Sequence, residues 1–341
     1  MNNLNQNLYN SHYSHIYVEK DVCSYHNTRK ILSHFPDSTI VEINHYKDVF
    51  CRSHQNYMLQ KQAPSLILAK KQNNLLYEGA PVCQNFGNSH FYYTSLVMNC
   101  IYDCEYCYLQ GMYPSANQVI FVNLEDIFHE VELLLKKHTV YLCVSYDTDL
   151  LAIESMLGYV KEWVDFASKH PDLTIEIRTK SANGIALNKL NPSANVIFAW
   201  TLSPQRITEH YEHNTPSFMQ RLNCILKAVE KGFPVRLCFD PMIYIENWES
   251  LYGEMIDTTF SVIPKEKIKD VSIGVFRVSH DYMKQMRKQR PNSLIIQYPF
   301  ENDNGVFHYS KDVTKEMISF AYNKISQILS TDRIFIWEEN D

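Results

Sequence analysis

Length, composition and charge set broad limits on this chain. It has 341 residues, 45% of them hydrophobic, and a formal net charge of -6 at pH 7, so it can bury the core of one large domain or two smaller ones. The charge excludes a protein coated in positive charge but not a local basic face. No stretch approaches the roughly 20 apolar residues of a spanning helix, and the polar N-terminal stretch lacks the features of a secretory signal. We therefore expect a cytoplasmic protein with no membrane partner.

The first 85 residues predict a small αβ unit. Residues 14–20, 38–45 and 65–71 have the pattern of strands, and residues 23–35 have that of a helix. The pattern between residues 46 and 88 is less regular, which places a domain boundary near residue 85. We expect an N-terminal αβ extension over residues 1–85 and a second domain over residues 86–341.

Strand and helix patterns alternate from residue 86 onward. Predicted strands cover residues 91–98, 139–146, 173–179, 195–203, 233–243 and 271–278. Predicted helices cover residues 124–137, with Asn123 as N-cap, 150–170, 184–190 and 248–260, and another opens at Thr215 and Pro216. At least six βα units favour a parallel sheet, either doubly wound or curled into a partial barrel, with function at the carboxyl ends of its strands.

The C-terminal residues break this alternation. Residues 293–310 contain two short strand-like runs about a polar turn with Asn and Gly, which predicts a β-hairpin at about residues 294–310. A helix over residues 315–329 and a strand over residues 333–339 are predicted to follow.

A loop of closely spaced cysteines carries the strongest chemical signal. Cys100, Cys104 and Cys107 have the spacing C-x3-C-x2-C directly after a predicted strand. Three thiolates can hold three irons of a 4Fe–4S cluster and leave the fourth iron open. The open iron can chelate S-adenosylmethionine, and an electron from the cluster can then release a 5′-deoxyadenosyl radical. A zinc site is the alternative, but zinc usually takes four ligands, and paired cysteine spacing is not repeated elsewhere. The nine cysteines are too few and too irregularly spaced for a disulfide scaffold.

This spacing is the hallmark of the radical S-adenosylmethionine superfamily, whose core is a partial (β/α)6 TIM-like barrel. The resemblance implies an α/β fold with that barrel, the N-terminal αβ extension and the C-terminal hairpin. Tyr106 occupies the position where the superfamily motif carries an aromatic residue that contacts adenine. A packed loop aromatic is the alternative role for Tyr106.

The string CEYCYLQ at residues 104–110 is more specific and resembles the spore photoproduct lyase family. SYDTDLLAIE (145–154), RTK (178–180), WTLSP (200–204) and residues 230–248 resemble further segments of that family in the same order. The resemblance implies a carbon–carbon lyase of sporulation and spore germination that reverses 5-thyminyl-5,6-dihydrothymine directly to two thymines. It implies ultraviolet-damaged DNA as substrate, a one-electron reductant such as flavodoxin or ferredoxin, and a monomer located in the spore core.

The family resemblance also implies a reaction sequence. The deoxyadenosyl radical removes a hydrogen from carbon 6 of the dihydrothymine, the bond between the thymines breaks, and a thiol quenches the resulting thymine allylic radical. Tyrosines help to return the hydrogen to deoxyadenosine, and Tyr106 and Tyr108 match their positions.

The chain departs from the family at the hydrogen donor. Tyr146 stands where most members carry the donating cysteine, so the donor must lie elsewhere or the step must differ. The candidates are Cys143, which strand alternation turns to the face opposite Tyr146, and Cys83, in a loop that could reach over the barrel mouth. We favour Cys83, with a buried structural thiol as the alternative. The remaining cysteines are interpreted as structural: Cys23, Cys51, Cys224 and Cys238.

The resemblance places several polar residues around S-adenosylmethionine. Thr148, Lys180 and Thr201 match residues that line its pocket in the family. Their types suit this role, because an ammonium can pair with the carboxylate of S-adenosylmethionine and hydroxyls can bind its ribose or amino group. Ser145 and Asp149 are further candidates near the same strand end. Without the resemblance, a solvated lysine and ordinary strand threonines would be the simpler interpretation.

The lesion must leave the duplex before its carbons can react. Tyr298 and Phe300 in the predicted hairpin could fill the gap, and four basic residues ahead of it could bind phosphates: Lys284, Arg287, Lys288 and Arg290. A solvated helix face and a simple cap on the barrel are the alternatives. Two competing functions remain: a radical enzyme acting on another nucleic acid or a peptide, and a non-catalytic iron–sulfur or zinc protein that binds DNA.

Overall fold

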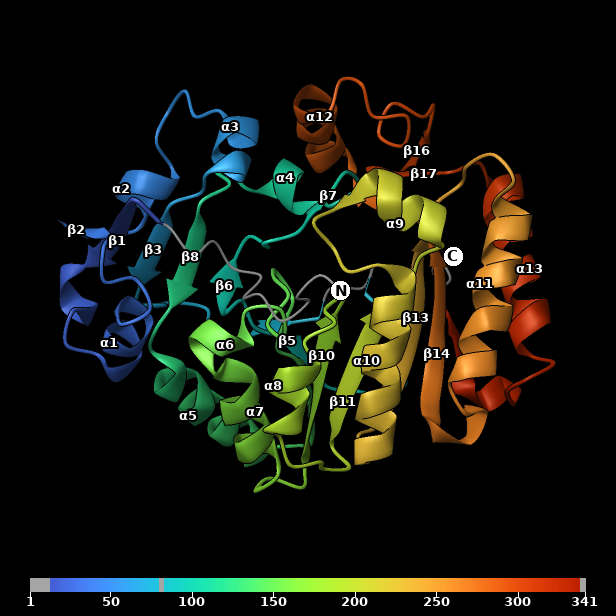
Figure 1. The fold of residues 1–341 in the computed structure, drawn as a ribbon, viewed down its shortest axis with the longest axis horizontal. Coiled ribbons are helices and arrows are strands. Elements are labelled where there is room, and N and C mark those ends of the chain that lie inside the picture. The colour runs from blue at the N-terminus through green and yellow to red at the C-terminus, as the bar shows by residue number, and fades with distance from the viewer. Residues whose placement is uncertain (1–12, 80–82, 338–341) are drawn as a thin grey trace.

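A curled sheet of mainly parallel strands forms the centre of the molecule (Figure 1). The computed structural model describes residues 13–79 and 83–337. The sheet has the order β18-β14-β13-β11-β10-β9-β5-β4, and every neighbouring pair except β4 with β5 is parallel. Its strands are β4 (Tyr77–Glu78), β5 (Phe91–Tyr93), β9 (Val140–Cys143), β10 (Leu173–Thr179), β11 (Val196–Thr201), β13 (Val235–Met242), β14 (Ile268–Val275) and β18 (Ile334–Ile336).

Apolar side chains explain why this sheet is enclosed on both faces. Every residue of β9 and β11 is buried, as expected for parallel strands between two covered faces. Helices follow the strands and cover the outer face (Figure 1): α5 (Leu124–Leu135), α7 (Tyr159–Ala167), α8 (Gly184–Asn188), α10 (Phe218–Lys231), α11 (Trp248–Val262) and α13 (Lys311–Ile325). The predicted partial barrel with alternating strands and helices is thus confirmed.

Several predicted boundaries were wrong for local reasons. The single helix predicted over residues 150–170 is split into α6 (Glu154–Leu157) and α7, because Gly158 has a φ of 72°. The helix predicted to open at Thr215 and Pro216 is α10, which begins after Ser217 with a Ser217–Gln220 capping box. Asn123 is the N-cap residue of α5, as predicted, but its side chain binds the backbone of Lys71 and the Asp126 carboxylate instead of a backbone N–H of the helix.

Two predicted strands also end differently in the structure. Residues 91–98 form two short strands, β5 and β6 (Val97–Met98), which belong to different sheets. β9 ends at Cys143, so Tyr146 lies in the following loop. The alternation argument that placed Cys143 and Tyr146 on opposite strand faces was therefore wrong, because Tyr146 is not on the strand.

The N-terminal unit has its own sheet, with order β2-β1-β3-β8-β6. Its strands are β1 (His15–Glu19), β2 (Thr39–Ile43), β3 (Leu66–Ala69), β8 (Gln118–Phe121) and β6, and the helices of the unit are α1 (His26–Leu32), α2 (Lys47–Phe50) and α3 (Tyr57–Gln62). The sequence did not predict β8. Because β6 and β8 follow residue 85 in the chain, the N-terminal sheet continues on both sides of the cysteine loop. The domain boundary near residue 85 stays a prediction, and residues 1–12 and 80–82 of the first domain and 338–341 of the second lie outside the described residues.

A small antiparallel sheet lies near the C-terminal end of the chain. It contains β15 (Arg277–Ser279), β16 (Glu301–Asp303) and β17 (Val306–His308), and α12 (His280–Gln289) precedes the hairpin. The hairpin turns at Asn304 and Gly305, both with positive φ. The hairpin is shorter than the predicted span of residues 294–310, because residues 294–297 form turns. Across the described residues, no helix is long and apolar enough to cross a membrane.

Candidate active site

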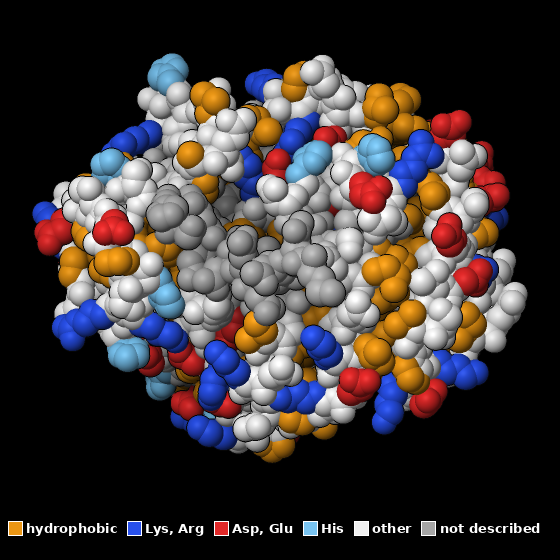
Figure 2. Space-filling model, in the orientation of Figure 1, with side chains coloured by type: hydrophobic (Ala, Val, Ile, Leu, Met, Phe, Trp, Pro, Cys, Tyr) orange, Lys and Arg blue, Asp and Glu red, His pale blue; other side chains and the backbone are white. Residues whose placement is uncertain are grey.

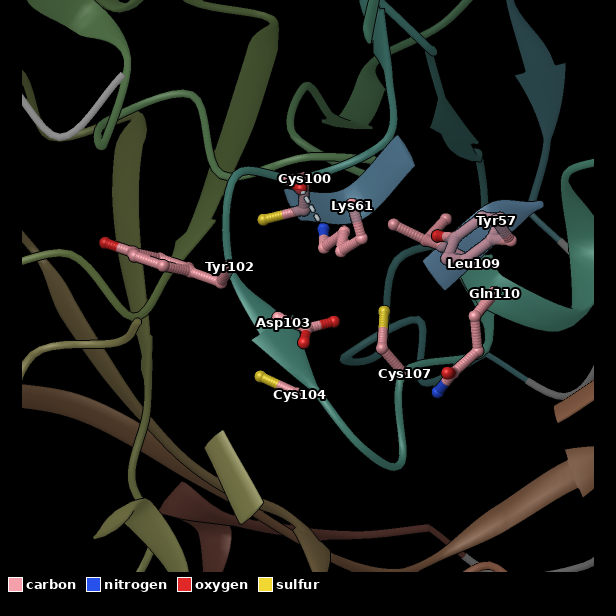
Figure 3. Close-up of a pocket in the computed structure, with 9 residues that line it drawn as sticks. All are labelled: Tyr57, Lys61, Cys100, Tyr102, Asp103, Cys104, Cys107, Leu109 and Gln110. Atoms are coloured by element: carbon pink, nitrogen blue, oxygen red, sulfur yellow. Dashed lines mark hydrogen bonds between the residues drawn. The ribbon is translucent and has the colours of Figure 1, made fainter. Parts of the chain in front are cut away.

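The cysteine loop lies between β6 and α4 (Leu109–Met112), and neighbouring backbone fixes its shape. Its short strand β7 (Asp103–Cys104) pairs with β12 (Glu212–His213), which follows α9 (Gln205–Tyr211). The backbone N–H of Cys107 donates to the Cys104 carbonyl at 3.1 Å. As a result, the thiols of Cys100, Cys104 and Cys107 line one pocket, with their sulfur atoms around a shared region (Figure 3).

The chemistry of these thiols fits an iron–sulfur cluster. Burial raises the pKa of the Cys100 thiol to about 12, and it also raises the pKa values of Cys104 and Cys107. Deprotonated thiols in such a pocket need a compensating positive charge, which bound metal supplies. Within residues 13–79 and 83–337, no three His, Cys, Asp or Glu side chains are close enough to hold one metal ion. A zinc site usually takes four ligands, whereas three thiolates can hold three irons of a 4Fe–4S cluster, so three cysteines on one loop fit a cluster better than a single zinc ion.

Helix α3 borders this pocket, although sequence reasoning assigned it no function. The Lys61 ammonium donates to the Cys100 carbonyl at 2.6 Å, and the Tyr57 hydroxyl donates to the Asn99 side-chain oxygen at 3.3 Å. Both Lys61 and Tyr57 line the pocket (Figure 3). The N-terminal unit thus supplies part of the wall around the cysteines. No signal for this contact is present in the sequence beyond the residue types of Lys61 and Tyr57.

A buried ionic network surrounds Tyr106. The Tyr106 hydroxyl donates to the Glu212 carboxylate, which also pairs with the Arg221 guanidinium and accepts from Ser203 Oγ at 2.8 Å. The Lys180 ammonium lies 3.7 Å from Glu212 Oε1 and 5.1 Å from the centre of the Tyr106 ring. Burial alone would raise the pKa of Glu212, but the charges of Arg221 and Lys180 lower it to about 2. Glu212 is therefore ionised and holds both Tyr106 and Lys180 in place.

Sequence reasoning missed Glu212 and Arg221. They lie far from the cysteine loop in the chain, and neither belongs to a recognisable motif. Arg221 is fully buried on α10, where its Nη1 donates to the Thr201 carbonyl at 3.2 Å. This bond links the end of β11 to the network around Tyr106. A buried arginine on the inward face of a helix could have drawn attention to a buried acidic partner.

The other predicted cofactor residues fall into two groups. Ser145 and Asp149 are engaged by the protein: Ser145 exchanges hydrogen bonds with the Arg178 backbone, and the Asp149 carboxylate accepts from Thr179 Oγ1 and the Lys180 N–H. By contrast, the buried Thr148 hydroxyl has no hydrogen-bond partner among the described residues. An unpaired buried hydroxyl in the loop after β9 fits a bound polar molecule such as S-adenosylmethionine.

Cys83 lies against Tyr146. Its Sγ is 3.4 Å from the Tyr146 hydroxyl, and the Tyr146 ring stacks on Tyr93 with centroids 4.1 Å apart. Tyr108 approaches from the cysteine loop and donates to the Tyr146 carbonyl at 3.0 Å. The structure therefore brings Cys83, Tyr108 and Tyr146 together, whereas the Tyr106 hydroxyl is directed to Glu212.

The segment that carries Cys83 is attached to the far side of the curled sheet. Gln84 Nε2 donates to the Ile336 carbonyl on β18 at 3.0 Å. Two residues later, the centre of the Phe86 ring lies 3.2 Å from the guanidinium carbon of Arg236 on β13. The segment therefore runs from the loop of Tyr146, where Cys83 lies, to contacts with β13 and β18.

The predicted DNA-contacting residues are also divided. Arg287 donates to the backbone carbonyls of Ile296 and Tyr298, and Arg290 pairs with Asp103 in the cysteine loop. Lys284 and Lys288 are exposed on α12. On the face shown in Figure 2, basic and acidic side chains are interspersed, with no single basic surface.

Of the two aromatic residues predicted to act as a wedge, Phe300 is buried and Tyr298 is half-buried. Phe300 is buried against Phe276, with ring centroids 5.3 Å apart, and Tyr298 lies 5.1 Å from both Phe300 and Tyr309. The hairpin instead presents polar residues at its exposed tip. Leu294, between α12 and the hairpin, is 77% exposed and was not singled out in the sequence.

Comparisons with known proteins relate this geometry to a family. A family model described as spore photoproduct lyase matches residues 12–300. A spore photoproduct lyase of Clostridium acetobutylicum is 23% identical over 255 residues, or 69% of this chain and 73% of that protein. The enzyme of Bacillus subtilis is 19% identical over 193 residues, or 55% of this chain and 56% of that protein.

Solved structures share the fold. A spore photoproduct lyase complexed with dinucleoside spore photoproduct has a TM-score of 0.82 at 17% identity, covering 95% of this chain and 98% of that one. A variant with bound S-adenosylmethionine and the same dinucleoside has a TM-score of 0.82 at 16% identity, covering 96% and 98%. The predicted fold class and family resemblance are confirmed.

Proposed function

Because the chain belongs to the spore photoproduct lyase family, we propose that it is a DNA repair lyase that converts spore photoproduct directly into two thymines. It is a radical S-adenosylmethionine enzyme of the carbon–carbon lyase type. The observation that carries this function is the meeting of three cysteines in one pocket beside the curled sheet, within a chain that matches the family over most of its length.

The residues around the cysteine pocket suit the start of the reaction. A 4Fe–4S cluster on Cys100, Cys104 and Cys107, with S-adenosylmethionine, would supply the deoxyadenosyl radical chemistry of the superfamily. Lys180 is held by Glu212, and its ammonium can pair with a ligand carboxylate. The Thr148 hydroxyl has no hydrogen-bond partner among the described residues, so it can bind a polar ligand. Thr201 lies at the end of β11, tied to the same network through Arg221. These contacts support Thr148, Lys180 and Thr201 as residues that bind S-adenosylmethionine.

Tyr106 and Tyr108 have different surroundings, which suggests different roles. Tyr106 is buried and hydrogen-bonded to an ionised carboxylate, so its ring forms a fixed wall beside Lys180. Tyr108 extends toward Tyr146 and lies 3.0 Å from its carbonyl oxygen. Of the two predicted relay tyrosines, Tyr108 is the one whose hydroxyl contacts the loop that carries Tyr146.

Cys83 is our proposed hydrogen-atom donor. Tyr146 occupies the position of the family's donating cysteine, and its hydroxyl is 3.4 Å from Cys83 Sγ. The thiol of Cys83 therefore lies beside the position from which the family donates. In the quenching step, the S–H bond of Cys83 breaks and a C–H bond forms on the thymine methyl carbon, which leaves a thiyl radical on Cys83.

Damaged DNA and a reductant complete the proposed reaction. Lys284 and Lys288 are available for phosphate contacts, whereas Arg287 and Arg290 support the fold around α12. We expect the enzyme to act as a monomer in the spore core, with electrons from a flavodoxin or ferredoxin.

The direct test is repair by the anaerobically reconstituted and reduced protein. With S-adenosylmethionine and dinucleoside spore photoproduct, thymine should form together with adenosyl cleavage products. Formation of deoxyadenosine without thymine would point to a radical enzyme with another substrate. A chain that binds no iron and cleaves no S-adenosylmethionine would have no enzymatic role of this kind.

A further inference from the structure

One cationic side chain from outside the barrel lies in the wall of the cysteine pocket. Lys61, at the end of α3, borders the pocket together with Cys100, Cys104 and Cys107. Its ammonium is 2.6 Å from the Cys100 carbonyl, the contact drawn as a dashed line in Figure 3. The Lys61 charge is therefore fixed directly beside the first cysteine of the loop.

The charge balance around the pocket makes Lys61 distinctive. Asp103 also lines the pocket, but its carboxylate is paired with the Arg290 guanidinium, so these two charges largely cancel. Lys61 has no carboxylate within ion-pair distance in residues 13–79 and 83–337, and the bond it donates goes to a neutral carbonyl. Among these residues, the pocket wall therefore carries one uncompensated positive charge.

Other contacts prevent α3 from moving away from the loop. Tyr57 binds the side chain of Asn99, the residue before Cys100, at 3.3 Å. Gln60 Oε1 accepts hydrogen bonds from Ser115 Oγ and the Ala116 N–H, both at 3.1 Å, on the other side of the loop. Because α3 is attached on both sides of the cysteine loop, the position of the Lys61 ammonium is set by the fold.

A fixed cation at this place has a predictable electrostatic effect. Reduction adds one negative charge to a cluster that is already anionic with three thiolates, and nearby positive charge stabilises the more negative state more strongly. We propose that Lys61 is a redox-tuning residue, which raises the midpoint potential of the cluster held by Cys100, Cys104 and Cys107. This inference rests on the proposed function, because it requires the cluster.

The test is a redox titration of reconstituted protein, followed by electron paramagnetic resonance of the reduced cluster. Lys61→Met should shift the midpoint to a more negative potential than in the wild type, whereas Lys61→Arg should keep it near the wild-type value. Lys47→Met is the matched control, because it removes the same charge from an exposed position of α2 that does not line the pocket. Its midpoint should equal that of the wild type.

The outcomes separate this inference from the function on which it rests. An unchanged midpoint in Lys61→Met with full iron content would overturn the role of Lys61, and so would an equal shift in Lys47→Met. Should Lys61→Met fail to hold iron, Lys61→Gln decides in the same way, because its amide can still donate to Cys100. A wild type that binds no cluster would instead refute the proposed function.

Discussion

Two parts of the candidate active site differ in the groups that surround them. The cysteine pocket is bordered by fixed charges: the Lys61 ammonium, the pair of Asp103 and Arg290, and the Glu212 network beyond Tyr106. The Cys83 thiol instead faces the Tyr146 hydroxyl, and the ring of Tyr93 stacks behind it. Burial raises the pKa of Tyr146, which keeps this hydroxyl protonated.

The difference corresponds to two kinds of chemistry. Electron transfer changes the charge of the reacting group, so fixed ions beside it alter the energetics strongly. Hydrogen-atom transfer moves a proton and an electron together, and neutral partners leave its charge balance unchanged. The molecule thus places charges around the group that would generate the radical, whereas the direct partner of the Cys83 thiol is a neutral hydroxyl. The nearby Asp147 carboxylate accepts hydrogen bonds from Tyr108 and Tyr113.

The largest expected effect comes from a substitution in the cysteine pocket that leaves the surroundings of Cys83 unchanged. Cys104→Ala removes one ligand of the proposed cluster, so iron should fall well below the roughly four atoms per chain of an intact cluster, and S-adenosylmethionine cleavage should be lost. Iron analysis and product chromatography measure both effects. Cys224→Ala is the matched control, because Cys224 is buried on α10 away from the pocket. Full iron content and cleavage in Cys104→Ala would contradict the ligand assignment.

The second prediction concerns a substitution at Cys83 that leaves the cysteine pocket unchanged. Cys83→Ala should retain the cluster and adenosyl cleavage, but most of the cleaved lesion should appear as radical adducts instead of thymine. Product analysis by mass spectrometry measures the ratio. Cys143→Ala is the control, because Cys143 has no contact with Tyr146 comparable to that of Cys83. A normal thymine yield in Cys83→Ala, or loss of thymine in Cys143→Ala, would move the donor elsewhere.

The third prediction concerns the contribution of the Glu212–Arg221 ion pair to the stability of the fold. Glu212→Gln leaves the Arg221 guanidinium buried without a charged partner, which should cost about 3–5 kcal/mol of unfolding free energy at neutral pH. Urea denaturation of the iron-free chain measures this difference. Glu209→Gln is the control, since Glu209 lies on the exposed face of α9. A Glu212→Gln chain as stable as the wild type would show that the network contributes little.

The stabilisation from Glu212 should depend on pH in a defined direction. The pKa of Glu212 is lowered from 4.5 to about 2 on folding, so its contribution is present above pH 4.5 and is lost as the pH falls toward 2. The gap in unfolding free energy between wild type and Glu212→Gln should therefore narrow over this window. A gap that widens on acidification would contradict the assigned ionisation.

The smallest expected effect concerns DNA binding. Replacing both Lys284 and Lys288 with alanine should reduce the salt dependence of duplex binding by roughly 0.9 in the log–log slope for each phosphate that is no longer neutralised. Fluorescence anisotropy at several salt concentrations measures that slope. Replacing the exposed Lys265 and Lys267, which lie after α11, is the control. Equal slopes for the wild type and the Lys284/Lys288 variant would remove α12 from the DNA surface.

Local sequence signals were sufficient for the parts of the site that are local. Three cysteines within one loop predicted a shared pocket, and the alternation of apolar strands and helices predicted the curled sheet. Partners distant in the chain were not predictable in this way. Glu212 meets Tyr106 only because β12 pairs with the cysteine loop, and Lys61 reaches Cys100 only because α3 packs across it.

Side-chain direction was the other limit of sequence reasoning. Tyr298 and Phe300 have the residue types of a wedge, yet Phe300 is buried and the half-buried Tyr298 packs against Phe300 and Tyr309. Arg287 and Arg290 have the charge for phosphate contacts, yet they satisfy carbonyls and a carboxylate of the protein. Composition marks such residues as candidates, and only the packing decides which of them face solvent.

The most direct test of the account follows hydrogen into the product. Thiol hydrogens exchange with solvent, so repair in D₂O by the wild type should place one deuterium in the methyl group of a product thymine. Cys83→Ala should lose this label, and Tyr146→Phe, which keeps the thiol, should retain it. Thymine formed in D₂O without methyl deuterium, or equally labelled thymine from Cys83→Ala, would contradict a neutral quenching site centred on Cys83.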